Sequence, residues 1–335
     1  KAGQSMRPIA KLTWEAQEDR RIVGTRLGQQ LTSSTSQPDS RKRAAPHGEA
    51  MSGDPQDPLD RPVVAVANAK GGVGKTSIVA NIAGLAARNG WQVLAIDLDP
   101  QGNLATDLGY QDRTDLGKSL SRTLRDGREP TTMHAVRPGL DVWAGGPALA
   151  AAVPSALIPQ VDNPLTEAIR STGTTYEMVF IDCPPALGPL VDAGLGSATH
   201  LLVPIRADHA SLAGLDLITE RFHHVRAVNP RLELLGVTLF DVSRAATAIA
   251  REVAQAIRRS FKDAEPRLLP AIRRSERSAF DMRREGLLAH EHGRDHTDDA
   301  ASKLARDYDE LARAVFDLIL PDLDASNHPS AGPFR

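Results

Sequence analysis

The chain has little of several features that would place it in other classes of protein. It contains a single cysteine, Cys183, so no disulfide can form within the chain and a reducing compartment is expected. One cysteine also cannot hold an iron–sulfur cluster by itself. No apolar run approaches the roughly 18 residues needed to span a bilayer, because the longest, at 144–153, is broken by glycine and proline. The first residues lack a signal-peptide pattern, and a cytoplasmic location is therefore predicted.

Charge of one sign is also scarce. The formal net charge is -2 over 335 residues, and 41% hydrophobic with 24% charged residues is the composition of an ordinary globular protein. A chain so close to neutral is no polyelectrolyte, so any contact with nucleic acid must come from a local basic patch. The length is sufficient to bury a large core.

Residues 1–60 differ in composition from the rest of the sequence. Residues 1–60 are polar and are expected to form a flexible arm, which can include non-native residues. The first 43 residues hold nine Lys or Arg against four Asp or Glu, which fits either a solvated tail or an accessory arm that contacts DNA. One domain is predicted at 61–322, followed by a flexible tail at 323–335.

From residue 61 onward, short apolar runs rich in β-branched residues alternate with helical stretches. Such alternation predicts βαβ units and hence an α/β fold, with a mostly parallel, doubly wound sheet covered on both faces. The predicted strands are 63–67, 92–96, 177–181, 200–205 and 234–240, and the predicted helices include 76–89, 212–228 and 245–261.

The segment from Val63 to Ser77 joins a buried strand to a helix through a glycine-rich turn. Its glycines permit backbone conformations that a side chain would forbid, and N–H groups at a helix start favour a phosphate. Lys75 is expected to place its ammonium at the β and γ phosphates, and Thr76 to offer its hydroxyl to Mg²⁺. A tight turn with an incidental lysine is the alternative. The predicted nucleotide-binding residues are Lys70, Gly71, Gly72, Val73, Gly74, Lys75, Thr76 and Ser77.

The loop departs from the general pattern G-x-x-x-x-G-K-[ST], because Ala69 stands at the first glycine position and Lys70 adds a second lysine. In this respect the loop resembles the deviant Walker A motif of the ParA/MinD family of P-loop NTPases. Further segments resemble those of ParA-type partition ATPases in particular. They are 94–103, similar to their second motif, 179–185, similar to their Walker B region, 200–215, and 272–277, which looks like a degraded I-P-R-N-x-R segment.

Three aspartates end predicted strands. Asp97 and Asp99 lie where α/β folds place ligand chemistry, and side chains two residues apart on a strand share a face. A helix cap or turn is the alternative role for Asp97. The resemblance implies that Asp99 orients the attacking water, while Asp97 and Asp182 support Mg²⁺ together with Thr76. It also implies that Lys70 reaches across an ATP-sandwich dimer, so that Lys70, Lys75 and Asp99 form the catalytic set.

The resemblance implies a function as well. It predicts a weak, Mg²⁺-dependent ATPase whose ATP-bound homodimer binds double-stranded DNA without sequence preference and so associates with the nucleoid. A ParB-like protein at a centromere-like site would stimulate hydrolysis and reset this switch, with no membrane involved. A MinD-like ATPase that cycles on membranes is the alternative, disfavoured because the C-terminal residues lack a basic amphipathic helix. A metabolic amide ligase with the same loop would need a further substrate domain, for which there is little room.

A local basic excess lies at 242–277, where nine Lys or Arg stand against four Asp or Glu. Such a segment can follow the phosphates of DNA, and the resemblance implies Arg244, Arg274 and Arg277 as the contacts. A solvated basic helix face is the alternative. Arg273 replaces the proline of the family's segment, so the family's local geometry does not carry over directly.

Overall fold

The computed structural model describes residues 61–152, 163–206, 208–243, 255–257, 259, 267–295 and 299–320. The predicted arm at 1–60, the tail at 323–335 and Arg244 lie outside these residues, as does most of the helix predicted at 245–261. Within the described part of the chain, no helix is both long enough and apolar enough to cross a membrane.

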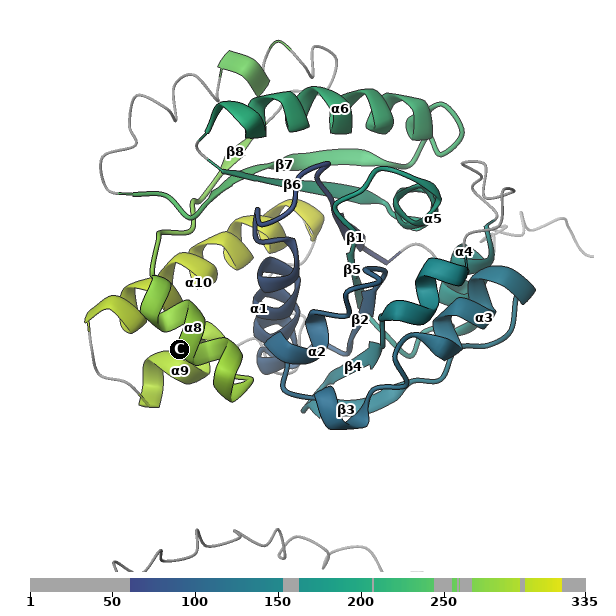
Figure 1. The fold of residues 1–335 in the computed structure, drawn as a ribbon, viewed down its shortest axis with the longest axis horizontal. Helices are drawn as coiled ribbons and strands as arrows, with labels where there is room; N and C mark the ends of the chain where they lie inside the picture. Colours follow the sequence, from purple (N-terminus) through teal and green to yellow (C-terminus); the bar gives the residue numbers. More distant parts are fainter. Residues whose placement is uncertain are drawn as a thin grey trace, which may run out of the picture. The chain divides into compact units, whose positions relative to one another are not determined.

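Eight strands of the described residues form one sheet in the order β3-β4-β2-β5-β1-β6-β7-β8 (Figure 1). Neighbouring strands are parallel except β3 and β4, which form an antiparallel hairpin at one edge. The mostly parallel sheet predicted from the sequence is confirmed. The strands are β1 (Val63–Val66), β2 (Val93–Asp97), β3 (Met133–Arg137), β4 (Leu140–Trp143), β5 (Met178–Asp182), β6 (His200–Arg206), β7 (Glu233–Phe240) and β8 (Leu268–Leu269).

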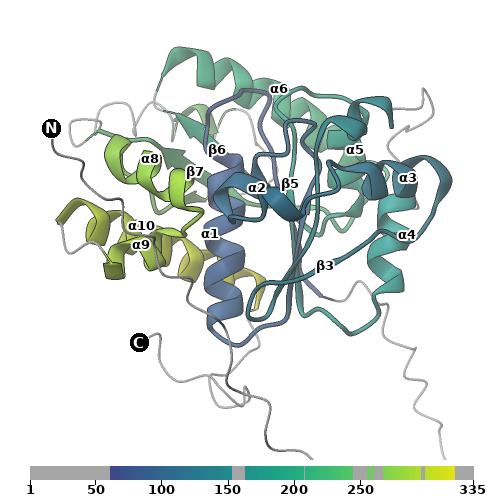
Figure 2. The same ribbon diagram turned by 60° about the horizontal axis from the view of Figure 1, so that its bottom comes forward.

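Helices cover both faces of this sheet, as a doubly wound fold requires. In both views α8, α9 and α10 lie beside α1, whereas α3 and α4 lie together on the opposite side of α1 (Figure 1, Figure 2). The helices are α1 (Lys75–Arg88), α2 (Leu104–Asp107), α3 (Lys118–Asp126), α4 (Pro164–Ser171), α5 (Pro189–Ser197), α6 (His209–Arg226), α8 (Glu276–Glu285), α9 (Ala289–Asp295) and α10 (Asp299–Ile319).

Strand β1 shows why its sequence is a continuous apolar run. Val63 and Ala65 belong to the core under α3–α6, and Val64 and Val66 to the core under α1 and α8–α10. None of the four is more than 1% exposed. A strand buried on both faces needs apolar side chains at every position, because successive side chains point to opposite faces.

The strand order brings the ends of the central strands together. β5 is inserted between β1 and β2, so Asp182 at the end of β5 is the register partner of Val66 on one side and Asp97 on the other. β6 flanks β1 on its free side. In parallel α/β sheets ligands bind at the carboxyl ends of strands where the order reverses, and this is such a point.

Candidate nucleotide-binding site

The turn between β1 and α1 adopts the conformation that its glycines permit. Gly72 and Gly74 have φ of 73° and 85°, in the left-handed region that residues with a side chain rarely occupy. Gly74 immediately precedes α1, so the first N–H groups of the helix open onto the turn. A Cβ atom at Gly74 would lie 2.3 Å from the ring of Phe240, so glycine is the residue that fits against that ring.

Lys75 is folded back over the loop. It is 6% exposed, and its ammonium donates to the main-chain carbonyl oxygens of Lys70 at 3.0 Å and Asn68 at 3.4 Å. Burial lowers the pKa of Lys75, and the nearby carboxylate of Asp182 opposes that shift. A buried ammonium beside the N–H groups of a glycine turn is suited to receive a phosphate.

Asp97 ends β2, Asp99 lies two residues beyond it, and both hold the following turn in place. Asp97 is fully buried, and its two carboxylate oxygens accept from the N–H groups of Asp99 at 2.9 Å and Leu104 at 3.3 Å. Burial and the carboxylate of Asp182 raise the pKa of Asp97 well above its ordinary value. Asp99 is 7% exposed and accepts from the N–H of Gln101 at 2.9 Å, which fixes its rotamer.

Asp182 is the least satisfied charged group of the site. It is fully buried, and neither carboxylate oxygen meets hydrogen-bond geometry with another protein group. Burial raises the pKa of Asp182 to about 7, although the Thr76 hydroxyl and the Lys75 ammonium lie near enough to oppose the shift. The buried oxygens of Asp182 therefore have fewer well-placed donors than buried carboxylates normally have.

The donor set around Asp182 fits a magnesium ion that is held jointly with phosphates. In the described part of the chain, no three His, Cys, Asp or Glu side chains are placed to hold a metal by themselves. Mg²⁺ seldom uses such a cage, because it keeps several waters and binds one or two carboxylates together with substrate phosphates. The carboxylates of Asp97 and Asp182, with the Thr76 hydroxyl, supply oxygen donors of that kind.

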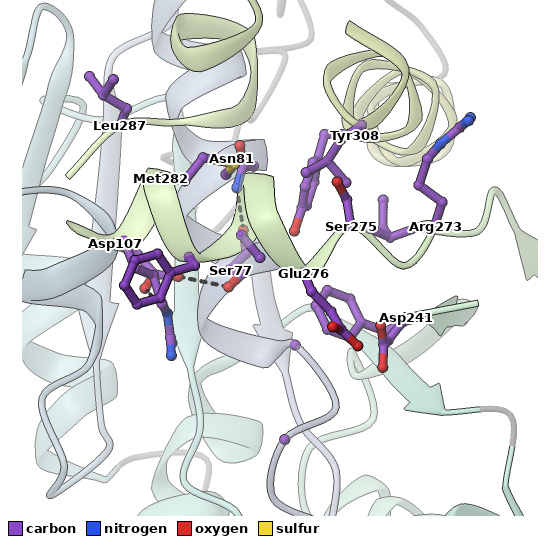
Figure 3. A pocket seen from close by; sticks show the side chains of 18 residues that line it. Ser77, Asn81, Asp107, Asp241, Arg273, Ser275, Glu276, Met282, Leu287 and Tyr308 are labelled. Carbon is purple, nitrogen blue, oxygen red and sulfur yellow. Dashed lines mark hydrogen bonds and ion pairs between the residues drawn. The ribbon is translucent and has the colours of Figure 1, made fainter. Parts of the chain in front are cut away.

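Ser77, predicted as part of the nucleotide-binding loop, turns its hydroxyl away from it. The hydroxyl donates to Asp107 Oδ2 at 2.7 Å (Figure 3). Arg283 Nε donates to the other oxygen, Asp107 Oδ1, at 2.9 Å. Helix α1 is thereby tied to α2 and α8. A contribution of Ser77 to nucleotide binding stays a prediction for its main-chain N–H.

A pocket of about 330 Å³ opens beside the loop, between the start of α1, the end of β7 and helices α8 and α10 (Figure 3). Gly72, Gly74 and Phe240 line it near the loop, and Glu276 and Tyr308 line it further away. Sequence reasoning missed this pocket. The available signal was the end of the strand predicted at 234–240, since strand ends in parallel sheets face the ligand crevice.

The second lysine of the loop, Lys70, lies at the edge of the site. Its ammonium is 2.7 Å from Asp208 Oδ1, and the two side chains are 29% and 42% exposed. Its main-chain N–H donates to Asn68 Oδ1 at 2.9 Å. A reach of Lys70 across a dimer stays a prediction.

The two described arginines predicted to contact DNA are each engaged with a carboxylate. Arg274 donates to both oxygens of Asp241 at 3.1 Å, and Arg206 also pairs with that carboxylate. Arg277 pairs with Asp281 at 2.6 Å on α8 and is 84% exposed. The structure thus places both guanidinium groups on the surface beside the pocket, already paired within the chain.

Arg273 explains the departure from the family's proline. Its main-chain N–H donates to Asp307 Oδ2 at 2.9 Å, and its guanidinium spans both oxygens of the same carboxylate at 2.6 and 2.5 Å. Proline has neither donor. In this chain the hydrogen bonds from Arg273 to Asp307 on α10 therefore fix the segment that precedes α8.

Comparisons with known proteins agree with this geometry. The sequence model of a family described as "AAA domain" matches residues 61–234. The chromosome-partitioning ATPase Soj of Thermus thermophilus is 36% identical over 202 residues, which cover 59% of this chain and 76% of the relative. The chromosome partitioning protein ParA of Caulobacter vibrioides is 37% identical over 213 residues, covering 60% of this chain and 77% of the relative.

Among solved structures, cobyrinic acid a,c-diamide synthase from Mycobacterium smegmatis, with bound ATP analog and magnesium, superimposes with a TM-score of 0.61. It is 29% identical in sequence, and the match covers 77% of this chain and 94% of that chain.

Proposed function

The chain belongs to the ParA/Soj family of partition ATPases, and we propose that it is a DNA-segregation ATPase that works as a nucleotide-controlled switch. The observation that carries this proposal is the group of buried charges at the end of the sheet. Lys75 and the three aspartates Asp97, Asp99 and Asp182 are buried beside a glycine loop, and Asp182 has only the Thr76 hydroxyl and the Lys75 ammonium nearby, neither in ordinary hydrogen-bond geometry. Such an arrangement is costly to bury without a charged ligand.

The ligand proposed for this site is ATP with Mg²⁺. The N–H groups of the loop and the Lys75 ammonium hold the phosphates, while Thr76, Asp97 and Asp182 hold the ion and its waters. Magnesium, when bound, neutralises phosphate charge and raises the electrophilicity of the γ phosphorus. Phe240 and the pocket beside it lie next to Gly74 and offer room for the remainder of the nucleotide.

Asp99 is proposed to orient the attacking water. Its rotamer is fixed by the Gln101 N–H, and its own main-chain N–H is fixed by Asp97, so its carboxylate is held beside the loop. Water attacks the γ phosphorus, and the bond from that phosphorus to the β-γ bridging oxygen breaks with its electron pair staying on ADP. The phosphate that leaves carries the oxygen and one proton of the water, and the other proton passes to solvent. Intrinsic turnover is slow in this scheme, and hydrolysis resets the switch.

The switch is proposed to act through dimerisation and DNA. Lys70 would reach the phosphates of a second copy, giving an ATP-sandwich homodimer. Arg274 and Arg277 lie on the exposed side of the segment that borders the pocket, and they would contact DNA phosphates without reading sequence. A ParB-like partner would stimulate hydrolysis, and the ATP-bound protein would sit on the nucleoid in the cytoplasm.

Co-sedimentation of the full chain with plain duplex DNA tests this function. The protein should pellet with DNA in ATP and Mg²⁺, and should remain in the supernatant in ADP or without nucleotide. Release of phosphate should require Mg²⁺ and stop on addition of EDTA. Nucleotide-independent pelleting, or no pelleting under any condition, would contradict a DNA switch, and hydrolysis without pelleting would leave an ATPase that acts on another surface.

A further inference from the structure

The Lys70 ammonium already has a counter-ion within its own chain. Lys70 Nζ lies 2.7 Å from Asp208 Oδ1, in a pair whose members are both partly exposed. Under the proposed function, this same ammonium must serve the phosphates of a second copy. In the free subunit, therefore, the Lys70 ammonium is paired with Asp208, whereas in the dimer it would have to pair with the phosphates of the second copy.

The fold itself brings these two residues together. Lys70 follows β1 and Asp208 follows β6, and these strands are parallel neighbours, with Val66 opposite Leu202 in the ladder. The carboxyl ends of adjacent parallel strands meet at one edge of a sheet, so the two residues are close although 138 positions separate them.

A buried amide ties the two strand ends to each other. Asn68 is fully buried, its Nδ2 donates to the carbonyl oxygen of Pro204 at 2.7 Å, and its Oδ1 accepts from the Lys70 N–H at 2.9 Å. Helix α6 also passes directly over this corner, because a Cβ atom at Gly214 would lie 2.9 Å from Asn68 Oδ1. The main chain on the Lys70 side of the ion pair is thus fixed relative to β6 and α6.

We propose that Asp208 is a positioning residue that holds Lys70 in the free subunit and competes with the phosphates of a second copy for it. Dimerisation is then an exchange, in which Lys70 leaves one anion for another. This inference rests on the proposed function, because it needs the ATP-sandwich dimer. Its consequence is that Asp208 sets how readily the dimer forms, without touching the reacting atoms.

The expected effect is small and has a definite sign. Exposed ion pairs contribute little, so removing Asp208 should tighten the dimer by about two- to five-fold. The gain should shrink as salt rises, because screening already weakens the competing pair. Asp208→Glu keeps the carboxylate and should behave as the wild type.

Sedimentation velocity of the full chain, with Mg²⁺ and a non-hydrolysable ATP analogue, measures the dimer dissociation constant directly. The variants are Asp208→Asn, Asp208→Glu and, as a matched control, Asp216→Asn, which removes the same charge from an exposed position further along α6. A melting curve for each variant checks that it folds. The expected result is a tighter dimer for Asp208→Asn and unchanged dimers for the other two.

An unchanged or weaker dimer in Asp208→Asn would overturn the inference. Equal tightening by Asp216→Asn would also overturn it, since net charge would then explain the effect. Failure of the proposed function looks different. A wild type that stays monomeric, or a Lys70→Ala variant that dimerises normally, would remove the sandwich role and this inference with it. If the wild type dimerises and Lys70→Ala does not, an inert Asp208→Asn refutes only the role of Asp208.

Discussion

Charged side chains have different partners at the glycine loop and in the basic segment at 242–277, which leads into α8. At the loop, Lys75 donates to main-chain carbonyls, and the buried Asp182 meets no donor in hydrogen-bond geometry. In the basic segment, Arg274 and Arg277 each pair with a carboxylate of the same chain.

The two regions therefore differ in how far their charged groups are already satisfied within the chain. Buried polar groups without partners are rare, and here they lie where a charged ligand would complete them. The arginines of the basic segment keep N–H groups that are not bonded to Asp241 or Asp281, but each of these carboxylates offsets part of the positive charge that would attract DNA. Ligand affinity should therefore depend on single residues at the loop, and on the sum of weak, salt-sensitive contacts in the basic segment.

Asp99→Ala should give the largest effect. Loss of water orientation should lower the hydrolysis rate by about 10²- to 10⁴-fold, the usual range for a positioned catalytic group. ATP affinity should stay within a few fold, because Lys75 and the loop remain. Phosphate release and equilibrium ATP binding measure the two effects separately. Equal loss of both would reassign Asp99 to binding or folding.

Lys75→Ala should come next. Removing the main counter-charge of the phosphates should weaken ATP binding by about 100-fold, since hydrogen bonds to charged groups are the strong ones. Isothermal titration calorimetry measures it. Lys303→Ala is the matched control, because that lysine sits on α10 and pairs with Asp299. Normal ATP affinity in Lys75→Ala would show that the loop does not act as a phosphate site.

Asp182→Asn should reveal how much the buried charge of Asp182 lowers the free energy of unfolding. The pKa of Asp182 is raised from 3.8 to about 7 in the folded chain, so between these values the folded form binds a proton that the unfolded form releases. Without nucleotide, the free energy of unfolding should therefore fall as pH rises from about 4 to about 7. At pH 8, Asp182→Asn should be more stable than the wild type by about 2 kcal/mol, while Mg²⁺-dependent hydrolysis is lost.

Urea denaturation at pH 5 and pH 8 measures this trade of stability against activity. Asp317→Asn, which changes an exposed carboxylate on α10, serves as the control. A wild-type stability that rises from pH 5 to pH 8 together with a destabilised Asp182→Asn would mean that Asp182 has donors in solution, and the contrast between the two regions would disappear.

The smallest effects are expected in the basic segment. Arg274→Ala and Arg277→Ala should each weaken DNA binding uniformly across sequences and flatten the slope of log affinity against log salt by about one unit. Arg244→Ala is predicted to do the same. Fluorescence anisotropy across a salt series measures the slope, with Arg313→Ala on α10 as the control. Unchanged binding with all three arginines replaced would move the DNA surface elsewhere, with the basic arm at 1–60 as the next candidate.

The pattern of apolar residues along the sequence predicted the central strands of the sheet but not the strands at its edges. β1, β2, β5, β6 and β7 fall within one residue of the predicted ranges, because full burial forces a continuous apolar run. The edge hairpin was missed: Val136 is the sole buried residue of β3, and β4, although mostly buried, has only four residues. β8 was missed as well, because a strand of two residues is too short to show an alternation of apolar and polar side chains.

The sequence by itself determined the glycine turn before α1 and the aspartates at and after the strand ends, because these depend on neighbours within a few residues and on burial. The tertiary structure alone decided which groups meet. Phe240 against Gly74, Asp208 beside Lys70 and Asp241 on Arg274 all join separate strands or segments. Their proximity follows from the strand order, in which β5 is inserted between β1 and β2 and β6 and β7 continue on the other side. No local pattern encodes that order, since it results from how whole faces of strands and helices pack.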